Sequence, residues 1–241
     1  MFRRNPAGQS SMRKFREERR AEMRASWRSL VFVIGLLILC AYLVIREDGF
    51  LQTFTAFVLG AGLTGLWCGW MLGFNARNLR WWWGAAGEQW TADELAKLNS
   101  DWRVYHDIPD GIGNWDHIAV GPPCVFAIDS KSLSEPATVD DQGLRAGRLH
   151  YGGNKTRSSA VRMKELIEQH SGHALWVQGV VAVWGQLPED VIERDKVLYV
   201  KASRLVETLE NQPPRGPRLT GAQRADVNEA LERIHRLRSD Q

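Results

Sequence analysis

Cysteine is scarce in this sequence, with three residues among 241. An odd count without paired spacing excludes a disulfide framework and fits a reducing compartment. The sequence also contains no CxxC or Cys/His spacing typical of a zinc site. It lacks a Walker motif, a Gly-rich phosphate loop and a recognisable Ser-His-Asp arrangement, so ATPase and serine hydrolase functions have no support.

Acidic residues are scarce in the first third of the chain, although the net charge is only +3. Residues 1–80 hold 12 Lys and Arg against 5 Asp and Glu, whereas residues 81–217 hold 14 against 19. Nine of the basic residues lie in an arm at 1–28. This arm is either a disordered basic segment or one attracted to anionic lipid headgroups, by about 1 kcal/mol per basic residue near the surface. The two interpretations are compatible.

Charged residues are absent from two stretches, 30–45 and 50–74, which a turn of four residues separates. A spanning helix needs about 17–25 residues, so the first stretch is short for one. It has no polar face, however, and this favours a spanning helix over a buried soluble helix. We therefore predict a two-helix transmembrane hairpin over residues 29–76, in contact with membrane lipid.

Small residues recur in the second stretch at Gly65, Gly69 and Gly73, one residue in every four. Residues at this spacing share one helix face and let another helix approach closely. Packing against the first apolar helix is the favoured use of this face. A homo-oligomer formed through the same glycines is the alternative.

The distribution of basic residues predicts the orientation of this hairpin. The arm at 1–28 holds nine Lys and Arg and the turn at 46–49 holds one, while Arg77 and Arg80 follow the second stretch. The positive-inside rule then places both termini and the soluble domain in the cytoplasm. The expected protein is a multi-pass protein of the cell membrane.

The most informative stretch of the remaining chain is 114–131, NWDHIAVGPPCVFAIDSK. Apolar residues precede and follow the turn-forming segment at 121–123, which predicts a β-hairpin. The simplest register across a four-residue loop sets Val120 opposite Val125.

That register would set Asp116 opposite Asp129, with their Cβ atoms roughly 5 Å apart. Lys131 lies two residues beyond Asp129 and so shares its face of the strand. Two close carboxylates repel unless a cation lies between them, and Mg²⁺ or Mn²⁺ suits such a position. The alternative is that the three residues are ordinary surface charges at strand ends.

Other segments predict helices and strands around this hairpin. A soluble domain is expected over 81–210, followed by a linker at 211–218 and a C-terminal helix at 219–241. The helices are expected at 84–98, 155–169 and 202–209, and Val161, Leu166 and Ile167 of the second are expected to face the core. The strands are expected at 102–106, 175–184 and 197–200, with a second hairpin at 137–139 and 148–151 around Gly143.

Glu88 shares one stripe of the helix at 84–98 with Ala92 and Leu95. A glutamate in a first turn often serves only to complement the helix macrodipole, and the local sequence favours that role. Near the other end of the chain, Thr220 and Gln223 form a capping-box pattern. The helix that follows them packs on the domain or, as the less favoured alternative, binds a partner or a second copy.

One window of the soluble domain is strongly basic, with no acidic residue between Asp141 and Glu165. A solvated charged surface is the usual explanation. Contact with the phosphates of DNA or RNA is the alternative. The basic residues are Arg145, Arg148, Lys155, Arg157, Arg162 and Lys164.

The order of these elements resembles the nuclease-related domain (NERD) family of the PD-(D/E)xK nuclease superfamily. The similarity covers roughly residues 84–205. It is carried by Gly87-Glu88 opening the first helix, by Asp116-His117 followed by 120–122, VGP, and by 125–131, VFAIDSK. The family usually has Glu where this chain has Asp129, and Asn-Pro where it has Asn154-Lys155.

The resemblance implies a restriction-endonuclease-like α/β fold, with a mixed sheet flanked by helices, and a role for each matching residue. Asp116 and Asp129 would ligate Mg²⁺, with the carbonyl of Ser130 as a third oxygen. Lys131 would activate the attacking water and stabilise charge on the phosphate. Glu88 would hold a second metal or a metal-bound water, which moves it from dipole partner to site residue.

The leading hypothesis is therefore a membrane-anchored, cytoplasm-facing, Mg²⁺-dependent nuclease that cleaves phosphodiester bonds. The alternative is a non-catalytic module that uses the same fold to bind nucleic acid or a protein at the membrane. Metal-dependent cleavage distinguishes the two.

Overall fold

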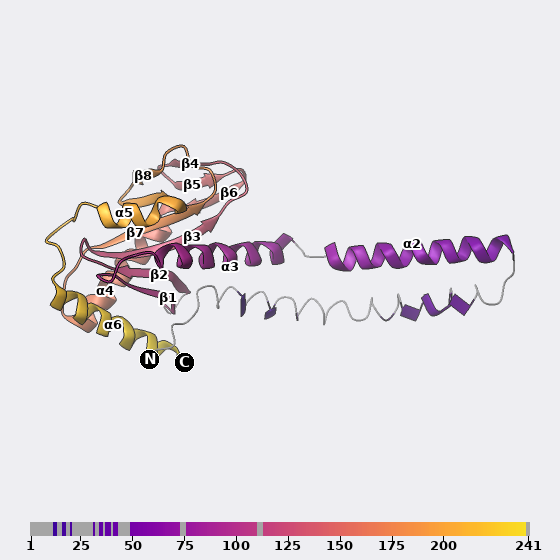
Figure 1. Cartoon of the computed structure of the whole chain (residues 1–241), viewed down its shortest axis with the longest axis horizontal. Helices are drawn as coiled ribbons and strands as arrows, with labels where there is room; N and C mark the ends of the chain where they lie inside the picture. The colour runs from indigo at the N-terminus through magenta and orange to yellow at the C-terminus, as the bar shows by residue number, and fades with distance from the viewer. Residues whose placement is uncertain are drawn as a thin grey trace. The chain divides into compact units, whose positions relative to one another are not determined.

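The computed structural model describes residues 49–72, 76–109 and 113–239, together with single residues and short pieces between 12 and 42. The chain divides into two compact units, Met12–Trp82 and Trp83–Gln241. The second unit contains the sheets and the candidate site, and Figure 1 labels its elements.

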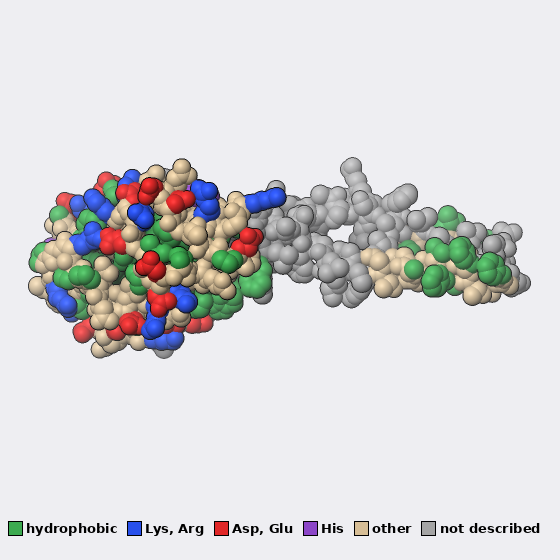
Figure 2. Space-filling view, turned by 90° about the horizontal axis from the view of Figure 1, so that it is seen from above, with side chains coloured by type: hydrophobic (Ala, Val, Ile, Leu, Met, Phe, Trp, Pro, Cys, Tyr) green, Lys and Arg blue, Asp and Glu red, His purple; other side chains and the backbone are tan. Residues whose placement is uncertain are grey.

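The first unit contains α2 (Phe50–Leu72), which coincides with the second predicted apolar stretch. Phe50, Phe54 and Phe57 are exposed on this helix, and Figure 2 shows hydrophobic side chains on part of its surface. In the described part of the chain, no helix is both long enough and apolar enough to cross a membrane. The predicted transmembrane hairpin is therefore not supported by the structure, and half of the residues of its first helix, 30–45, lie outside the described residues together with Gly73.

The second unit is built on a mixed six-stranded sheet, as predicted for an α/β fold. Three adjacent strands run parallel, and every other neighbouring pair of strands in this sheet is antiparallel. In spatial order the strands are β1 (Arg103–Pro109), β2 (Asn114–Val120), β3 (Val125–Ser132), β7 (Val177–Trp184), β9 (Val197–Lys201) and β8 (Val191–Arg194).

Helices cover both faces of this sheet, which explains the almost continuous apolar sequence of its central strands. One face, here called the α4 face, packs against α4 (Gly153–Ser171) and α6 (Gly221–Ser239). The other, here called the α3 face, packs against α3 (Ala76–Leu95) and the short α5 (Leu205–Asn211). Every residue of β7 except Trp184 is buried.

A second, three-stranded antiparallel sheet packs on the α4 face beside the ends of β7 and β9. Its strands are β4 (Ala137–Asp140), β5 (Gly143–Ala146) and β6 (Leu149–Gly152). The predicted pairing of 137–139 with 148–151 is wrong, because both segments pair with β5 instead. The chain reverses twice, and at the second reversal Gly147 adopts a φ of 53°, which favours glycine.

Two other predictions about helices and strands need correction. The helix predicted at 84–98 begins earlier, at Ala76, so Glu88 lies in its interior and not in the first turn. Val161 was expected to face the core from the next helix, but it is 49% exposed, whereas Met163 is fully buried. The short edge strand β8 was not predicted, because its sequence, VIER, carries little apolar signal.

The C-terminal helix α6 packs on the domain, which is the favoured of the two alternatives. Val227, Leu231 and Ile234 belong to the core of the α4 face. The capping box also forms, because the backbone N–H of Gln223 donates to Thr220 Oγ1 at 3.2 Å and the Thr220 N–H donates to Gln223 Oε1 at 3.0 Å. This helix is a structural part of the second unit.

Candidate functional site

The β2–β3 hairpin has the predicted register. Val120 pairs with Val125 and His117 with Ile128 across the two strands. Continued by one residue, this register sets Asp116 opposite Asp129. Strand alternation places both carboxylates on the α4 face, where Ile118 and Val125 contribute to the core.

Lys131 extends from the same face of β3 and contacts two oxygens. Its Nζ lies 2.6 Å from Asp129 Oδ1 and 3.2 Å from the backbone carbonyl oxygen of Ser130. The ammonium also lies 5.4 Å from the ring centroid of Tyr151 on β6. Burial lowers the pKa of Lys131, but the attraction of Asp129 and Asp116 outweighs it and raises the pKa above 10.5.

The environment of Asp116 strongly perturbs its carboxyl group. Burial raises its pKa well above 3.8, and the nearby charges of Asp129 and Glu88 raise it further. Lys131 and the hydrogen bond from the Ser130 N–H, 2.9 Å from Asp116 Oδ2, lower it only in part. A proton or a bound cation is therefore favoured at this position.

Glu88 is buried in the middle of α3 and is 8% exposed. It shares a buried stripe with Ala92 and Leu95, as predicted from their spacing. Its mid-helix position removes the macrodipole explanation, and its effect on the pKa of Asp116 places it electrostatically with the site. Glu88, Asp116, Asp129 and Lys131 are referred to below as the carboxylate–lysine cluster.

The oxygens of this cluster suit a hard divalent cation. Asp129 Oδ1 and the Ser130 carbonyl oxygen already contact one cation, the ammonium of Lys131. Among the described residues, however, no group of three or more His, Cys, Asp or Glu side chains is arranged to hold a metal ion. Mg²⁺ is commonly bound by one or two carboxylates with water and substrate phosphate completing its shell, so the donor set fits such an ion.

A chain of buried polar side chains lies behind the cluster, on the α3 face of the same strands. His117 is fully buried, and its Nε2 lies 3.1 Å from Ser130 Oγ. The Ser130 hydroxyl in turn donates to Thr91 Oγ1 on α3, at 2.9 Å. Burial, with His106 nearby, lowers the pKa of His117 to about 3, so this imidazole is neutral at physiological pH.

Sequence reasoning missed this chain and the contact of Tyr151. A signal was present, because His117 and Ser130 interrupt otherwise apolar strands and fall on the face opposite Asp116 and Asp129. Their partner Thr91 is about 40 residues from Ser130 in sequence, and the contact could only be found from the packing of α3 on the sheet.

The basic window is spread over β5, the turn after it and α4. Arg145 lies 3.1 Å from Asp140, and Arg157 lies 2.6 Å from Asp195. Arg148, Lys155 and Lys164 are exposed. On the face shown in Figure 2, basic and acidic side chains are interspersed and do not form one continuous basic surface.

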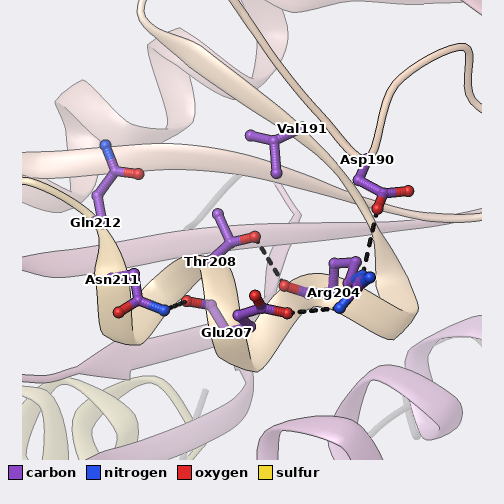
Figure 3. Close-up of a pocket in the computed structure, with 7 residues that line it drawn as sticks. All are labelled: Asp190, Val191, Arg204, Glu207, Thr208, Asn211 and Gln212. Atoms are coloured by element: carbon purple, nitrogen blue, oxygen red, sulfur yellow. Dashed lines mark hydrogen bonds and ion pairs between the residues drawn. The ribbon is translucent and has the colours of Figure 1, made fainter.

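A pocket of about 330 Å³ lies away from the cluster, between β8 and α5. Figure 3 shows Arg204 within it, bonded to both Asp190 and Glu207. Arg204 Nε is 3.3 Å from Asp190 Oδ2, and its NH1 is 2.8 Å from Glu207 Oε2. This hollow is referred to below as the α5 pocket, and its charges are exposed and paired.

Residues 83–184 match the family model described as NERD, nuclease-related domain. The matched segment begins in α3, ends with β7 and contains all four residues of the carboxylate–lysine cluster. No curated protein and no solved structure matches the chain.

Proposed function

We propose that this protein is a metal-dependent nuclease that hydrolyses phosphodiester bonds at the carboxylate–lysine cluster. The observation that carries this proposal is the hairpin register. Asp116 and Asp129 are the next residues along the two strands after the last recorded pair, His117 and Ile128, and Lys131 Nζ lies 2.6 Å from Asp129, inside the segment that matches a nuclease-related domain. An under-compensated pair of carboxylates beside one ammonium suits a reaction on a negatively charged phosphate.

Each residue of the cluster has a role in this proposal. Asp116, Asp129 and the Ser130 carbonyl oxygen would hold Mg²⁺ or Mn²⁺, and a bound ion would supply Lewis-acid stabilisation of the phosphate. Lys131 would orient the attacking water and stabilise charge on the phosphate oxygens. Glu88 would complete the site from α3, by holding a water or a second ion.

Lys131 has to leave part of its present contacts for this arrangement to form. Its Nζ contacts one oxygen in each of two groups assigned to the metal, Asp129 Oδ1 and the Ser130 carbonyl oxygen. The ammonium and a divalent ion therefore compete for these oxygens, and the metal affinity depends on the position of the Lys131 side chain. Tyr151, 5.4 Å away, offers the ammonium a second contact that does not use those oxygens.

The test is cleavage of plasmid DNA and of single-stranded RNA by the full chain, with Mg²⁺ or Mn²⁺ and with EDTA. Cleavage that requires the metal and is lost in Lys131→Ala supports the nuclease. The full chain is used because α6 contributes Val227 and Leu231 to the core, so a fragment that ends at residue 217 would lose part of its core.

A non-catalytic binding module is the second candidate. It is favoured by the pairs Arg145–Asp140 and Arg157–Asp195, which reduce the charge available to bind phosphates, and by Asp129 in place of the family's usual Glu. Binding of nucleic acid without metal-dependent cleavage supports this candidate over the nuclease.

The exposed members of the basic window are proposed to contact the nucleic-acid backbone. Neutralising Arg148, Lys155 and Lys164 together should weaken binding equally for all sequences. It should also reduce the slope of log affinity against log salt by about one per lost contact. Unchanged slopes would show that these residues form a solvated charged surface that does not contact nucleic acid.

We also propose that the first unit attaches the protein to the cell membrane. Both termini of the protein would then lie in the cytoplasm. The support for this proposal is the exposed apolar surface of α2, including Phe50 and Phe57, and the nine basic residues in 1–28. Reporter fusions at Gln241 and extraction of membranes at alkaline pH provide the test. Release of the protein into the soluble fraction, or a signal from a reporter active only outside the cytoplasm, contradicts it.

A further inference from the structure

The buried polar chain on the α3 face links four elements without a break. His106 Nδ1 on β1 lies 2.7 Å from His117 Nδ1 on β2. From there the chain continues through Ser130 to Thr91 on α3. It ends at two groups, because Thr91 Oγ1 lies 2.9 Å from both the Gly87 carbonyl oxygen and Trp184 Nε1.

The two terminal groups fix the direction of every hydrogen bond in the chain. The indole N–H of Trp184 can only donate, and the carbonyl of Gly87 can only accept. Thr91 therefore gives its single hydroxyl proton to Gly87 and accepts from Trp184 and from Ser130. Ser130 has given its own proton to Thr91, so Ser130 Oγ accepts from His117.

This order determines the tautomer of His117. Its Nε2 carries the proton that is donated to Ser130, and a neutral imidazole then has a bare Nδ1. That nitrogen accepts from the Nδ1–H of His106. One consistent proton order thus extends from β1 to the interior of α3.

Ser130 connects this chain to Asp116 and Lys131 of the carboxylate–lysine cluster. Its side chain is held by His117 and Thr91, while its backbone N–H donates to Asp116 Oδ2 at 2.9 Å. Its carbonyl oxygen accepts from Lys131 Nζ at 3.2 Å. Ser130 thus contributes its hydroxyl to the polar chain and its backbone N–H and carbonyl to the cluster. No other described residue is recorded with all three of these contacts.

We propose that His117 is a positioning residue: in its Nε2–H tautomer it fixes Ser130 and thereby the placement of Asp116 and Lys131 for metal binding and catalysis. The catalytic part of this inference rests on the proposed nuclease function. The tautomer and the placement of Ser130 do not, so they can be tested separately.

The tautomer is tested by long-range ¹H–¹⁵N spectra of the full chain labelled at histidine nitrogens, with the His117 signals assigned from their loss in His117→Gln. The expected result is a protonated Nε2 and an unprotonated Nδ1 at neutral pH. The reverse tautomer overturns the proton order and the proposal with it.

The positioning role is tested with a pair of variants at one site. His117→Leu fills the space but cannot donate to Ser130, whereas His117→Gln retains an amide donor. We expect His117→Leu to speed hydrogen exchange of the Ser130 amide about tenfold or more and to raise the Mn²⁺ concentration needed for half of the thermal shift by about 10–100-fold. His117→Gln should restore both values to within about threefold of the wild type.

Gln178→Leu is the matched control. Gln178 is a buried polar residue of similar size on β7 and donates to the carbonyl oxygens of Gly179 and Lys196. This variant should lose stability and yet keep the exchange rate of Ser130 and the Mn²⁺ midpoint. In cleavage assays His117→Leu should lower kcat and leave the KM for DNA unchanged, because His117 is fully buried behind the cluster.

The outcomes separate the two proposals. If the wild type shows neither a Mn²⁺-dependent shift nor cleavage, the nuclease fails, and the exchange of the Ser130 amide still decides the role of His117. If His117→Leu leaves that exchange unchanged, or changes it no more than Gln178→Leu does, His117 is a structural residue only and the proposal is overturned.

Discussion

The carboxylate–lysine cluster and the α5 pocket are both groups of charged residues, but they satisfy their charges differently. In the α5 pocket, Asp190 contacts both Lys201 and Arg204, and every member of these pairs is at least 44% exposed. In the cluster, Asp116 faces Asp129 with one ammonium between several carboxylates, and burial raises the pKa of Asp116. The pocket has the volume of a ligand site, but the cluster has the unbalanced charge.

This difference shows which feature is the better guide to chemistry. In a pocket lined by paired, solvated charges, binding a charged ligand of either sign gains little electrostatic free energy. Carboxylates that are buried and incompletely paired make the folded protein favour a cation or a proton at that point. The following predictions test whether the two regions differ in this way.

The largest effect is expected for Asp129→Asn on cleavage. The amide keeps the volume of the side chain but removes one of the two charges assigned to the metal, so cleavage should fall by about a hundredfold or more. Asp190→Asn makes the same chemical change in the α5 pocket and should leave cleavage unchanged. Equal losses in both variants would show that the cluster is not the reacting site.

The next effect concerns acid stability and His117. The pKa of this residue is 6.5 in the unfolded chain and about 3 in the fold, because burial disfavours the imidazolium. Between those values the unfolded state binds more protons, so stability is lost as the pH falls from 6.5 toward 3, by a total on the order of 5 kcal/mol.

Urea unfolding of the wild type and of His117→Gln over pH 3–7 isolates this contribution, because the other titrating groups are common to both proteins. The free energy of unfolding of the wild type should fall more steeply with decreasing pH. Parallel curves for the two proteins would mean that the pKa of His117 is the same in the folded and unfolded states.

A smaller effect of opposite sign is expected at Asp116 when metal is absent. Its folded pKa is raised above 3.8, chiefly by burial, so above that pH the unfolded chain releases a proton that the folded protein retains. Stability is therefore lost as the pH rises from 3.8 toward the folded pKa. Asp116→Asn removes this penalty and keeps an oxygen that can accept from the Ser130 N–H.

Thermal melts in EDTA at pH 7.5 should then show Asp116→Asn melting higher than the wild type, by roughly 2–4 °C for about 1 kcal/mol. With Mn²⁺ added, the wild type should gain stability and the variant should not. A lower melting temperature for the variant in EDTA would show that the charge of Asp116 stabilises the fold.

The main features of the site could be predicted from sequence because they depend on local rules. Two apolar segments around a turn at 121–123 set the register of the hairpin as far as His117 and Ile128, and Asp116 and Asp129 are the residues that follow this pair. The alternation of strand residues then placed Lys131 beside Asp129. Each step uses residues that are close in the chain.

Features that depend on packing between distant segments were not predictable in this way. Thr91 meets Ser130 and Trp184 only because α3 lies across the sheet. The small sheet was misjudged because its strands have four residues each, too few for a clear apolar alternation. Val161 was assigned to the core as an apolar residue, although Ala160 and Met163 occupy the buried stripe of that helix.

The smallest effect is expected for Asp190→Asn on stability. Asp190 accepts from Lys201 Nζ at 3.4 Å and from Arg204 Nε at 3.3 Å, so one substitution removes both ion pairs. Ion pairs between exposed side chains contribute little, because water and salt screen them and because ordering two long side chains costs entropy. The melting temperature should therefore stay within about 2 °C of the wild type.

The same measurement at low and high salt sharpens the contrast with the cluster. Raising the salt concentration should reduce even the small difference at Asp190, whereas the effect of Asp116→Asn should persist because that carboxyl is buried. If Asp190→Asn instead lowers the melting temperature by more than about 5 °C at high salt, its pairs are not screened. The α5 pocket would then be a structural charge network of the same importance as the cluster.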